Sequence, residues 1–131
     1  MTSNYQQAQQ SFDLQQAAQR FLSGSVDALN ACYECCDRHA LPGQIALFWQ
    51  GKDGRKEQYT FRELQQRASQ FANFLKSQGV SKGDRVSGLL PRTPELIITI
   101  LAAWRIGAVY QPLFTAFGPK AIEHRLQLAQ S

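Results

Sequence analysis

The sequence lacks the signals that mark membrane, secreted or nucleic-acid-binding proteins. Its most apolar run, Leu96 to Trp104, is far shorter than the roughly 20 residues that span a bilayer, so we expect no membrane span. The first 19 residues contain no basic region followed by an apolar one, so no secretory signal is expected. The net charge is +4, but the lysines and arginines do not form a dense basic block. Neither a helix-turn-helix pattern nor an RNP-type aromatic motif is present. These absences predict a cytoplasmic protein that binds no nucleic acid.

Motifs for binding triphosphates and for nucleophilic catalysis are also missing. The glycines form neither G-x-x-x-x-G-K-[ST] nor G-x-G-x-x-G, the patterns whose backbone N–H groups cradle phosphates. There is no G-x-S-x-G motif, and neither His39 nor His124 stands near a recognisable nucleophile. We therefore predict a surface or capping role for both histidines and no catalytic residue in this chain.

Cysteine is scarce, and its three copies are crowded into Cys32, Cys35 and Cys36. An odd, clustered set is a poor disulfide framework and suits a reducing compartment. On one continuous helix, these residues and His39 would bring four metal-capable groups to one face. The alternative is that the thiols fill small apolar gaps. Because structural zinc sites usually draw ligands from two separate elements, we predict packing and no metal site.

What is present indicates one folded domain preceded by a polar leader. A length of 131 residues with 44% hydrophobic residues allows a single core. We place the leader at residues 1–25 and the domain at residues 26–131. The first 20 residues contain seven glutamines, so we predict a weakly helical or mobile leader that docks through Phe12 and Phe21.

The first half of the domain is predicted to contain a short helix, a β-hairpin and a long helix. The short helix spans 27–39, and the hairpin strands span 45–50 and 57–60. Asp53-Gly54 between them predicts a two-residue type I′ turn, in which both central residues have positive φ. Thr60 and Glu63 predict a capping box at the start of the long helix.

The long helix is predicted to carry one buried stripe and to end in a Schellman motif. The stripe recurs at steps of three and four, at Phe61, Leu64, Ala68, Phe71 and Leu75. At the end, Gly79 suits the left-handed position and Val80 can contact Leu75.

The second half predicts a βαβα unit, hence the α/β class. Strands are expected at 85–90 and 108–113, with helices at 94–106 and from 118 onward. Thr93 is expected to cap the first of these helices, and Pro94 suits its first turn. The two strands should be parallel neighbours with a right-handed crossover. Parallel sheets usually have more strands, so we expect an incomplete sheet, a domain truncated at Ser131, and self-association through the unpaired edge.

Several blocks in this order resemble the N-terminal part of AMP-forming acyl-CoA synthetases, closest to the acetyl-CoA and medium-chain branches. The resemblance runs from about Leu29 to Leu126 and leaves the glutamine-rich leader outside. The blocks are Tyr59-Thr60-Phe61-Arg62-Glu63-Leu64, Gly79-Val80-Ser81-Lys82-Gly83-Asp84-Arg85-Val86, Leu90-Pro91-Arg92-Thr93-Pro94-Glu95-Leu96 and Arg105-Ile106-Gly107-Ala108-Val109-Tyr110.

The resemblance implies a site at the loop Phe114 to Pro119. In acetyl-CoA synthetases the matching loop, typically Phe-Gly-Gly-Phe, lines the coenzyme A nucleotide, which makes Phe114, Thr115 and Ala116 its counterparts. This chain has Thr-Ala in place of Gly-Gly. The loop follows a parallel strand and precedes a helix, which is where α/β folds bind ligands. The alternative interpretation is that Phe114 and Phe117 belong to the core.

The resemblance also implies a division of labour. The intact enzyme would convert a carboxylic acid and ATP to an acyl-adenylate and pyrophosphate, then transfer the acyl group to coenzyme A with Mg²⁺ assistance. ATP, Mg²⁺ and coenzyme A are thus implied for the whole enzyme, while no cofactor is assigned to these 131 residues alone. Their partner would be the remainder of the synthetase chain. The alternative is a free-standing, non-catalytic binding module on the same scaffold.

Overall fold

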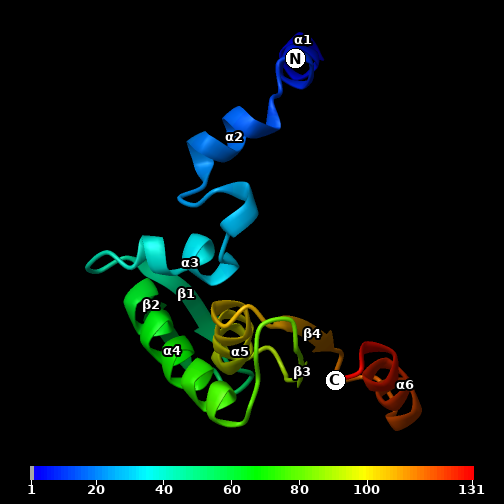
Figure 1. Ribbon diagram of the computed structural model, residues 1–131. Coiled ribbons are helices and arrows are strands. Elements are labelled where there is room, and N and C mark those ends of the chain that lie inside the picture. Colours follow the sequence, from blue (N-terminus) through cyan, green and yellow to red (C-terminus); the bar gives the residue numbers. More distant parts are fainter. Residues whose placement is uncertain (1) are drawn as a thin grey trace.

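The computed structural model describes residues 2–131 and shows a mixed α/β body with a helical extension (Figure 1). The elements in chain order are α1 (Thr2–Gln10), α2 (Leu14–Phe21), the 3₁₀ helix η1 (Val26–Ala28), α3 (Ala31–Cys35), the 3₁₀ helix η2 (Asp37–His39), β1 (Ile45–Gln50), β2 (Lys56–Thr60), α4 (Phe61–Ser77), β3 (Arg85–Leu89), α5 (Pro94–Arg105), β4 (Val109–Leu113) and α6 (Pro119–Ala129). None of the helices within the described range combines the length and apolar character needed to cross a membrane.

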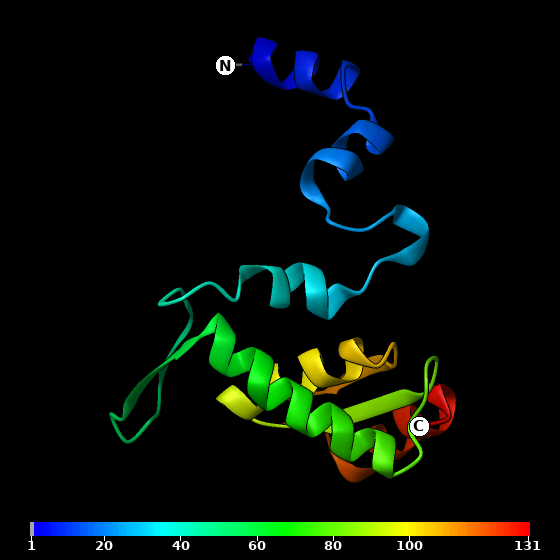
Figure 2. The same cartoon turned by 60° about the vertical axis from the view of Figure 1, so that its left-hand side comes forward.

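The leader is helical, but it does not dock on the body as predicted. The helices α1 and α2 extend away from the body in both ribbon views (Figures 1 and 2). Asp13 caps α2 by accepting hydrogen bonds from the backbone N–H groups of Gln15 and Gln16. Phe12 and Phe21 are both exposed, so neither ring anchors the leader to the described part of the chain.

Residues 27–39 form three short turns, so the prediction of one helix there is wrong. The Asn30 side chain accepts a hydrogen bond from the Tyr33 N–H and starts α3 at Ala31. The helix stops after five residues because Cys36 leaves helical geometry, at φ −132° and ψ −60°. Sequence reasoning missed both breaks, since an asparagine N-cap inside a periodic pattern competes with helix propagation.

The hairpin is confirmed, but its turn differs from the predicted type I′. Strands β1 and β2 pair antiparallel, with Phe48 opposite Gln58 and Gln50 opposite Lys56. Of the two turn residues only Gly54 has a positive φ, at 84°, while Asp53 does not. The Gly51 carbonyl accepts from the Gly54 N–H at 3.0 Å, so the connection is a longer loop closed by a left-handed glycine.

Helix α4 matches its predicted signals at both ends. Thr60 and Glu63 form the capping box, with the Thr60 side chain accepting from the Glu63 N–H at 3.1 Å. At the far end, the N–H of Val80 donates to the Leu75 carbonyl at 3.1 Å and Gly79 has φ 89°, which is the Schellman arrangement.

The βαβα prediction is confirmed. Strands β3 and β4 pair in parallel, with Arg85 opposite Val109 and Leu89 opposite Leu113. They form a two-stranded sheet separate from the hairpin. Thr93 stands at the N-cap of α5, but its side chain makes no capping hydrogen bond there. Helix α6 buries no residue, and side-chain hydrogen bonds from Arg85 and Gln111 reach its backbone carbonyls.

The core lies between α4 and α5, which pack against each other along their lengths (Figure 2). The residues of the predicted α4 stripe enter this core, with Leu64, Ala68 and Leu75 buried. The α3–η2 segment covers one end of it and is attached by polar contacts to the end of α5. Asp37 pairs with Arg105 at 2.6 Å, and the Asn30 amide donates to the Arg105 carbonyl at 3.1 Å.

Candidate functional site: a cleft at the ends of the parallel strands

A cleft of about 430 Å³ with a mainly apolar lining lies at the carboxyl ends of β3 and β4. This end of a parallel sheet is where α/β folds place ligands, because the loops there are free to diverge. Its walls come from β3, the β3–α5 connection, α5, β4, the β4–α6 loop and α6. The lining residues are Gly88, Leu90, Pro91, Arg92, Leu96, Tyr110, Pro112, Leu113, Phe114, Thr115, Phe117 and Arg125.

The β4–α6 loop forms one wall of the cleft and is organised by its two aromatic rings. The Phe117 N–H donates to the Phe114 carbonyl at 2.9 Å, which closes a turn. The rings of Phe114 and Phe117 meet edge to face, with centroids 5.6 Å apart. Phe114 is nevertheless 59% exposed, so the alternative that it belongs to the core is wrong for this chain.

The predicted site residues do not all reach the cleft. Phe114 and Thr115 line it, whereas Ala116 is exposed and does not. Neither Thr115 nor Ala116 has a positive φ. The loop as it stands therefore uses backbone conformations that side-chain-bearing residues adopt without the strain that would call for glycine.

The cleft is basic, because its charged lining residues are Arg92 and Arg125, without a carboxylate. The guanidinium of Arg125 lies over the Phe117 ring, 4.0 Å from its centroid, and donates to the Ala121 carbonyl at 3.0 Å. Arg92 is exposed, and its carbonyl accepts a hydrogen bond from the Trp49 indole at 2.9 Å. The arrangement suits a ligand that carries negative charge and an apolar or aromatic portion.

Tyr110 and Gly88 shape the floor of the cleft. A Cβ at Gly88 would overlap the Tyr110 ring, with Cε2 only 2.8 Å away, so the glycine allows the ring to lie against β3. The Tyr110 hydroxyl is buried without a hydrogen-bond partner among the described residues, and burial raises its pKa. Sequence reasoning missed Arg92, Tyr110 and Arg125. A glycine inside a strand was the one available signal, since it often marks a close approach.

The cysteine cluster does not form a metal site on one face. Cys32 and Cys36 are buried while Cys35 is exposed, because the helix ends between them. Burial raises the pKa of Cys32 to about 12 and that of Cys36 to about 11. Within residues 2–131, no three His, Cys, Asp or Glu side chains are grouped closely enough to hold a metal ion. The two buried thiols instead fill the core beneath α3.

The two histidines differ in their surroundings. His39 donates from Nε2 to the Glu34 carbonyl at 3.1 Å and stands beside the Phe61 ring. His124 is exposed on α6. The His39 contact agrees with the predicted capping role.

Comparison with protein families matches residues 33–131 to the family described as AMP-binding enzyme. The chain belongs to this family. Among curated proteins it is similar to the acetyl-coenzyme A synthetase of Halorhodospira halophila, at 40% identity over 92% of this chain and 19% of that protein. It is also similar to that of Bacillus subtilis, at 38% identity over 98% of this chain and 23% of that protein.

A solved acyl-CoA synthetase contains the same arrangement of elements. The crystal structure of Brucella canis acyl-CoA synthetase superposes with a TM-score of 0.92 and 48% identity, over 97% of this chain and 23% of that one. The predicted resemblance is therefore confirmed. It also extends beyond residues 29–126, because a match over 98% of the chain includes most of the leader.

The chain spans about a fifth of the length of the relatives it matches. Within this family it corresponds to the N-terminal region of acetyl-CoA and acyl-CoA synthetases. The alternative of a free-standing binding module finds no support in these comparisons.

Proposed function

We propose that this chain acts as the N-terminal part of an AMP-forming acyl-CoA synthetase, with residues 26–131 beginning the AMP-binding domain and residues 1–25 preceding it. One observation carries the proposal, namely the TM-score of 0.92 at 48% identity to an acyl-CoA synthetase over 97% of this chain. In such an enzyme a carboxylic acid and ATP give an acyl-adenylate and pyrophosphate, and the acyl group then passes to coenzyme A.

We propose that these 131 residues have a structural role in the synthetase and form one wall of its coenzyme A site. Phe114, Thr115 and Ala116 would contact the nucleotide end of coenzyme A, as the resemblance implies. The lining supports this assignment, because two arginines without a carboxylate suit a phosphate-bearing ligand, and the exposed Phe114 ring offers an apolar surface. Ala116 would take part only through its backbone, since it does not line the cleft.

ATP and Mg²⁺ do not fit the residues of this chain alone. The cleft offers no carboxylate for a cation, and the sequence has no glycine-rich phosphate cradle. We assign the groups that position ATP and Mg²⁺ to the part of a synthetase that lies outside this segment.

A chimera tests the proposed function. Residues 1–131 replace the matching segment of the Brucella canis acyl-CoA synthetase, and pyrophosphate release is measured with ATP, Mg²⁺, coenzyme A and a panel of carboxylates. We expect an active enzyme, because the two segments share their fold at 48% identity. A soluble, folded chimera without activity on any carboxylate would contradict the proposal.

The coenzyme A assignment is tested in the same chimera. Phe114→Ala is expected to raise the KM for coenzyme A by about tenfold. Acyl-adenylate formation, followed as ATP–pyrophosphate exchange without coenzyme A, should change little. Phe74→Ala, at a similarly exposed phenylalanine outside the cleft, is the matched control. Equal losses in both half-reactions would assign Phe114 to folding instead.

Two further proposals concern the isolated chain. Each of β3 and β4 has one partner strand, so we propose self-association through their free edges. Light scattering over a concentration series tests this, and a monomer at all concentrations would contradict it.

A cytoplasmic location is supported by three free cysteines. Fractionation of cells that produce the chain would check it.

A further inference from the structure

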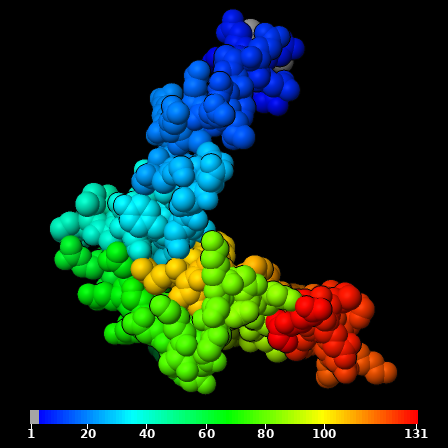
Figure 3. Space-filling view, in the orientation of Figure 1, coloured from blue at the N-terminus to red at the C-terminus, as the bar shows by residue number. Residues whose placement is uncertain are grey.

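Helix α6 is attached to the parallel sheet by polar contacts, although it buries no residue. It stands at one end of the molecule in the space-filling view (Figure 3). The Ser87 hydroxyl of β3 donates to the side-chain carbonyl of Gln111 on β4 at 2.5 Å, and the Gln111 amide donates to the backbone carbonyl of Arg125 at 3.1 Å. These two hydrogen bonds fix the turn of α6 that contains Arg125 relative to both strands.

The side chain of Arg125 connects α6 to the β4–α6 loop. Its guanidinium lies 4.0 Å from the centroid of the Phe117 ring and donates to the Ala121 carbonyl at 3.0 Å. The Phe117 ring in turn meets the Phe114 ring edge to face, with centroids 5.6 Å apart. A planar guanidinium that stacks on a ring and also donates a hydrogen bond holds that ring in one orientation. We call Arg125, Phe117 and Phe114 the loop stack.

The orientation of Phe114 depends on this stack more than on the core. Phe114 is 59% exposed, and both its ring contact and its backbone hydrogen bond are with Phe117. Thr115 and Ala116 between the two rings are exposed as well, and neither has a positive φ that would restrict the backbone to one turn type. The loop is therefore held at Phe117, and Phe117 is held by Arg125.

From these contacts we infer that Arg125 is a positioning residue for coenzyme A, which acts through Phe117 on Phe114. The inference rests on the proposed function, in which Phe114 contacts the nucleotide end of coenzyme A. A ring that already has its bound orientation loses little side-chain freedom when the ligand binds, so the loop stack strengthens coenzyme A binding. Adenylate formation precedes that binding and should not depend on Arg125.

The KM for coenzyme A in the chimera described above tests this role. Arg125→Met removes the guanidinium and keeps a long side chain, so we expect the KM for coenzyme A to rise about fivefold. ATP–pyrophosphate exchange without coenzyme A should change little. Arg20→Met is the matched control, because Arg20 also lies over a phenylalanine ring, that of Phe21 at 5.2 Å, but outside the cleft. An unchanged KM in Arg125→Met, or equal losses in both half-reactions, would overturn the inference.

A double-mutant cycle separates positioning from a direct contact between Arg125 and the ligand. If Arg125 acts through Phe117, Phe117→Leu alone should raise the KM about as much as Arg125→Met, and the double variant should be no worse than either. Arg125→Lys keeps the charge but loses the planar group, so we expect it to raise the KM nearly as much as Arg125→Met. Effects that multiply in the double variant, or full recovery of the KM by lysine, would overturn the positioning role.

Hydrogen exchange in the isolated chain distinguishes failure of this inference from failure of the proposed function. The Phe117 N–H closes the loop turn, so Arg125→Met should speed exchange of this amide by about fivefold and leave that of Ala68 in the core unchanged. Equal exchange of the Phe117 amide with and without the substitution would overturn the inference, even beside an active chimera. An inactive chimera, together with faster exchange in Arg125→Met, would support the loop stack and count against the proposed function alone.

Discussion

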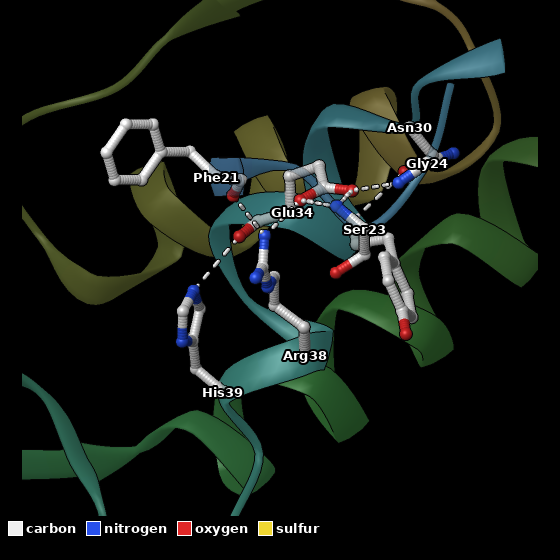
Figure 4. A network of polar contacts seen from close by, with 8 residues as sticks. Phe21, Ser23, Gly24, Asn30, Glu34, Arg38 and His39 are labelled. Atoms are coloured by element: carbon white, nitrogen blue, oxygen red, sulfur yellow. Dashed lines mark hydrogen bonds and ion pairs between the residues drawn. The ribbon is translucent and has the colours of Figure 1, made fainter. Parts of the chain in front are cut away.

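The α/β body, residues 26–131, and the N-terminal arm, residues 2–25, are held in place by different kinds of contact. The body is held by apolar packing of α4 on α5, with Leu64, Ala68, Leu101 and Ala102 buried between them. The arm is held to the body by a few charged and backbone hydrogen bonds around Glu34 (Figure 4). Apolar packing protects a core from water, whereas the few polar contacts of Glu34 and Arg38 fix the direction of the arm without burying apolar surface. The comparison predicts that substitutions in the two regions differ in what they disturb.

The largest effect is expected from removing a core side chain. Leu64→Ala deletes a buried side chain of α4 and should cost about 2–5 kcal/mol of unfolding free energy, because the cavity closes only in part. Urea denaturation measures it. Leu128→Ala, at an exposed leucine of α6, should change stability by no more than about 0.5 kcal/mol. Equal effects of the two substitutions would contradict the assigned core.

The next effect compares two ion pairs of equal length in different surroundings. Asp37–Arg105 and Asp53–Arg55 both measure 2.6 Å, but the first pair is largely buried and the second is exposed. Asp37→Asn should lower the unfolding free energy by about 1.5–3 kcal/mol, because it weakens a charged hydrogen bond that holds η2 to α5. Asp53→Asn should have a much smaller effect, since solvent and salt screen that pair. A larger loss for Asp53→Asn would refute the comparison.

Thiol reactivity should distinguish the core from the surface within a single short segment. At pH 8 we expect one fast-reacting thiol per chain, Cys35, because burial raises the pKa of Cys32 and Cys36 and shields both from reagent. Titration with a chromogenic disulfide should give one thiol in native protein and three in urea. A Cys35→Ser variant with one fast thiol remaining would contradict the assigned burial.

The smallest effect on stability is expected from the polar contacts of Glu34 with Ser23, Gly24 and Arg38, and these contacts should depend on pH. Although desolvation acts in the opposite direction, hydrogen bonds from Ser23, Arg38 and Gly24 lower the pKa of Glu34 below its ordinary value of 4.5. A depressed carboxylate pKa means that these contacts are fully formed above pH 4.5 and are lost as the pH falls through the folded-state pKa.

The amide chemical shifts of Ser23 and Gly24 should therefore titrate together, with a midpoint below pH 4.5. Glu34→Gln should abolish this titration. A midpoint at or above 4.5 in the unsubstituted protein would show that the carboxylate is not stabilised by these donors.

Sequence reasoning succeeded where local chemistry decides the structure. The α4 capping box, its Schellman ending and the parallel βαβα unit each depend on short-range signals or chirality rules, and each is present. It failed where two local signals compete. The Asn30 cap divided the predicted helix over 27–39, and the hairpin loop closed through Gly54 alone instead of a type I′ turn.

The candidate site was predictable only in part. The loop after β4 could be located, because parallel strands present their carboxyl ends together. The contributions of Arg92 and Arg125 could not, since they depend on how the β3–α5 connection and α6 lie beside the sheet. For Tyr110 the only signal was Gly88 inside the neighbouring strand. The polar contacts of Glu34 were likewise hidden, because its carboxylate reaches residues about ten positions earlier through backbone groups that carry no sequence signature.

The central claim is that this chain forms structural elements and one wall of the coenzyme A site. The residues that position ATP and Mg²⁺ for adenylation lie in another part of a synthetase. Pyrophosphate release by the isolated 131-residue chain, measured with ATP, Mg²⁺, coenzyme A and short and medium carboxylates, tests it most directly. We predict release no greater than in a blank without protein, alongside an active chimera under the same conditions. Release by the isolated chain above that blank would contradict the claim.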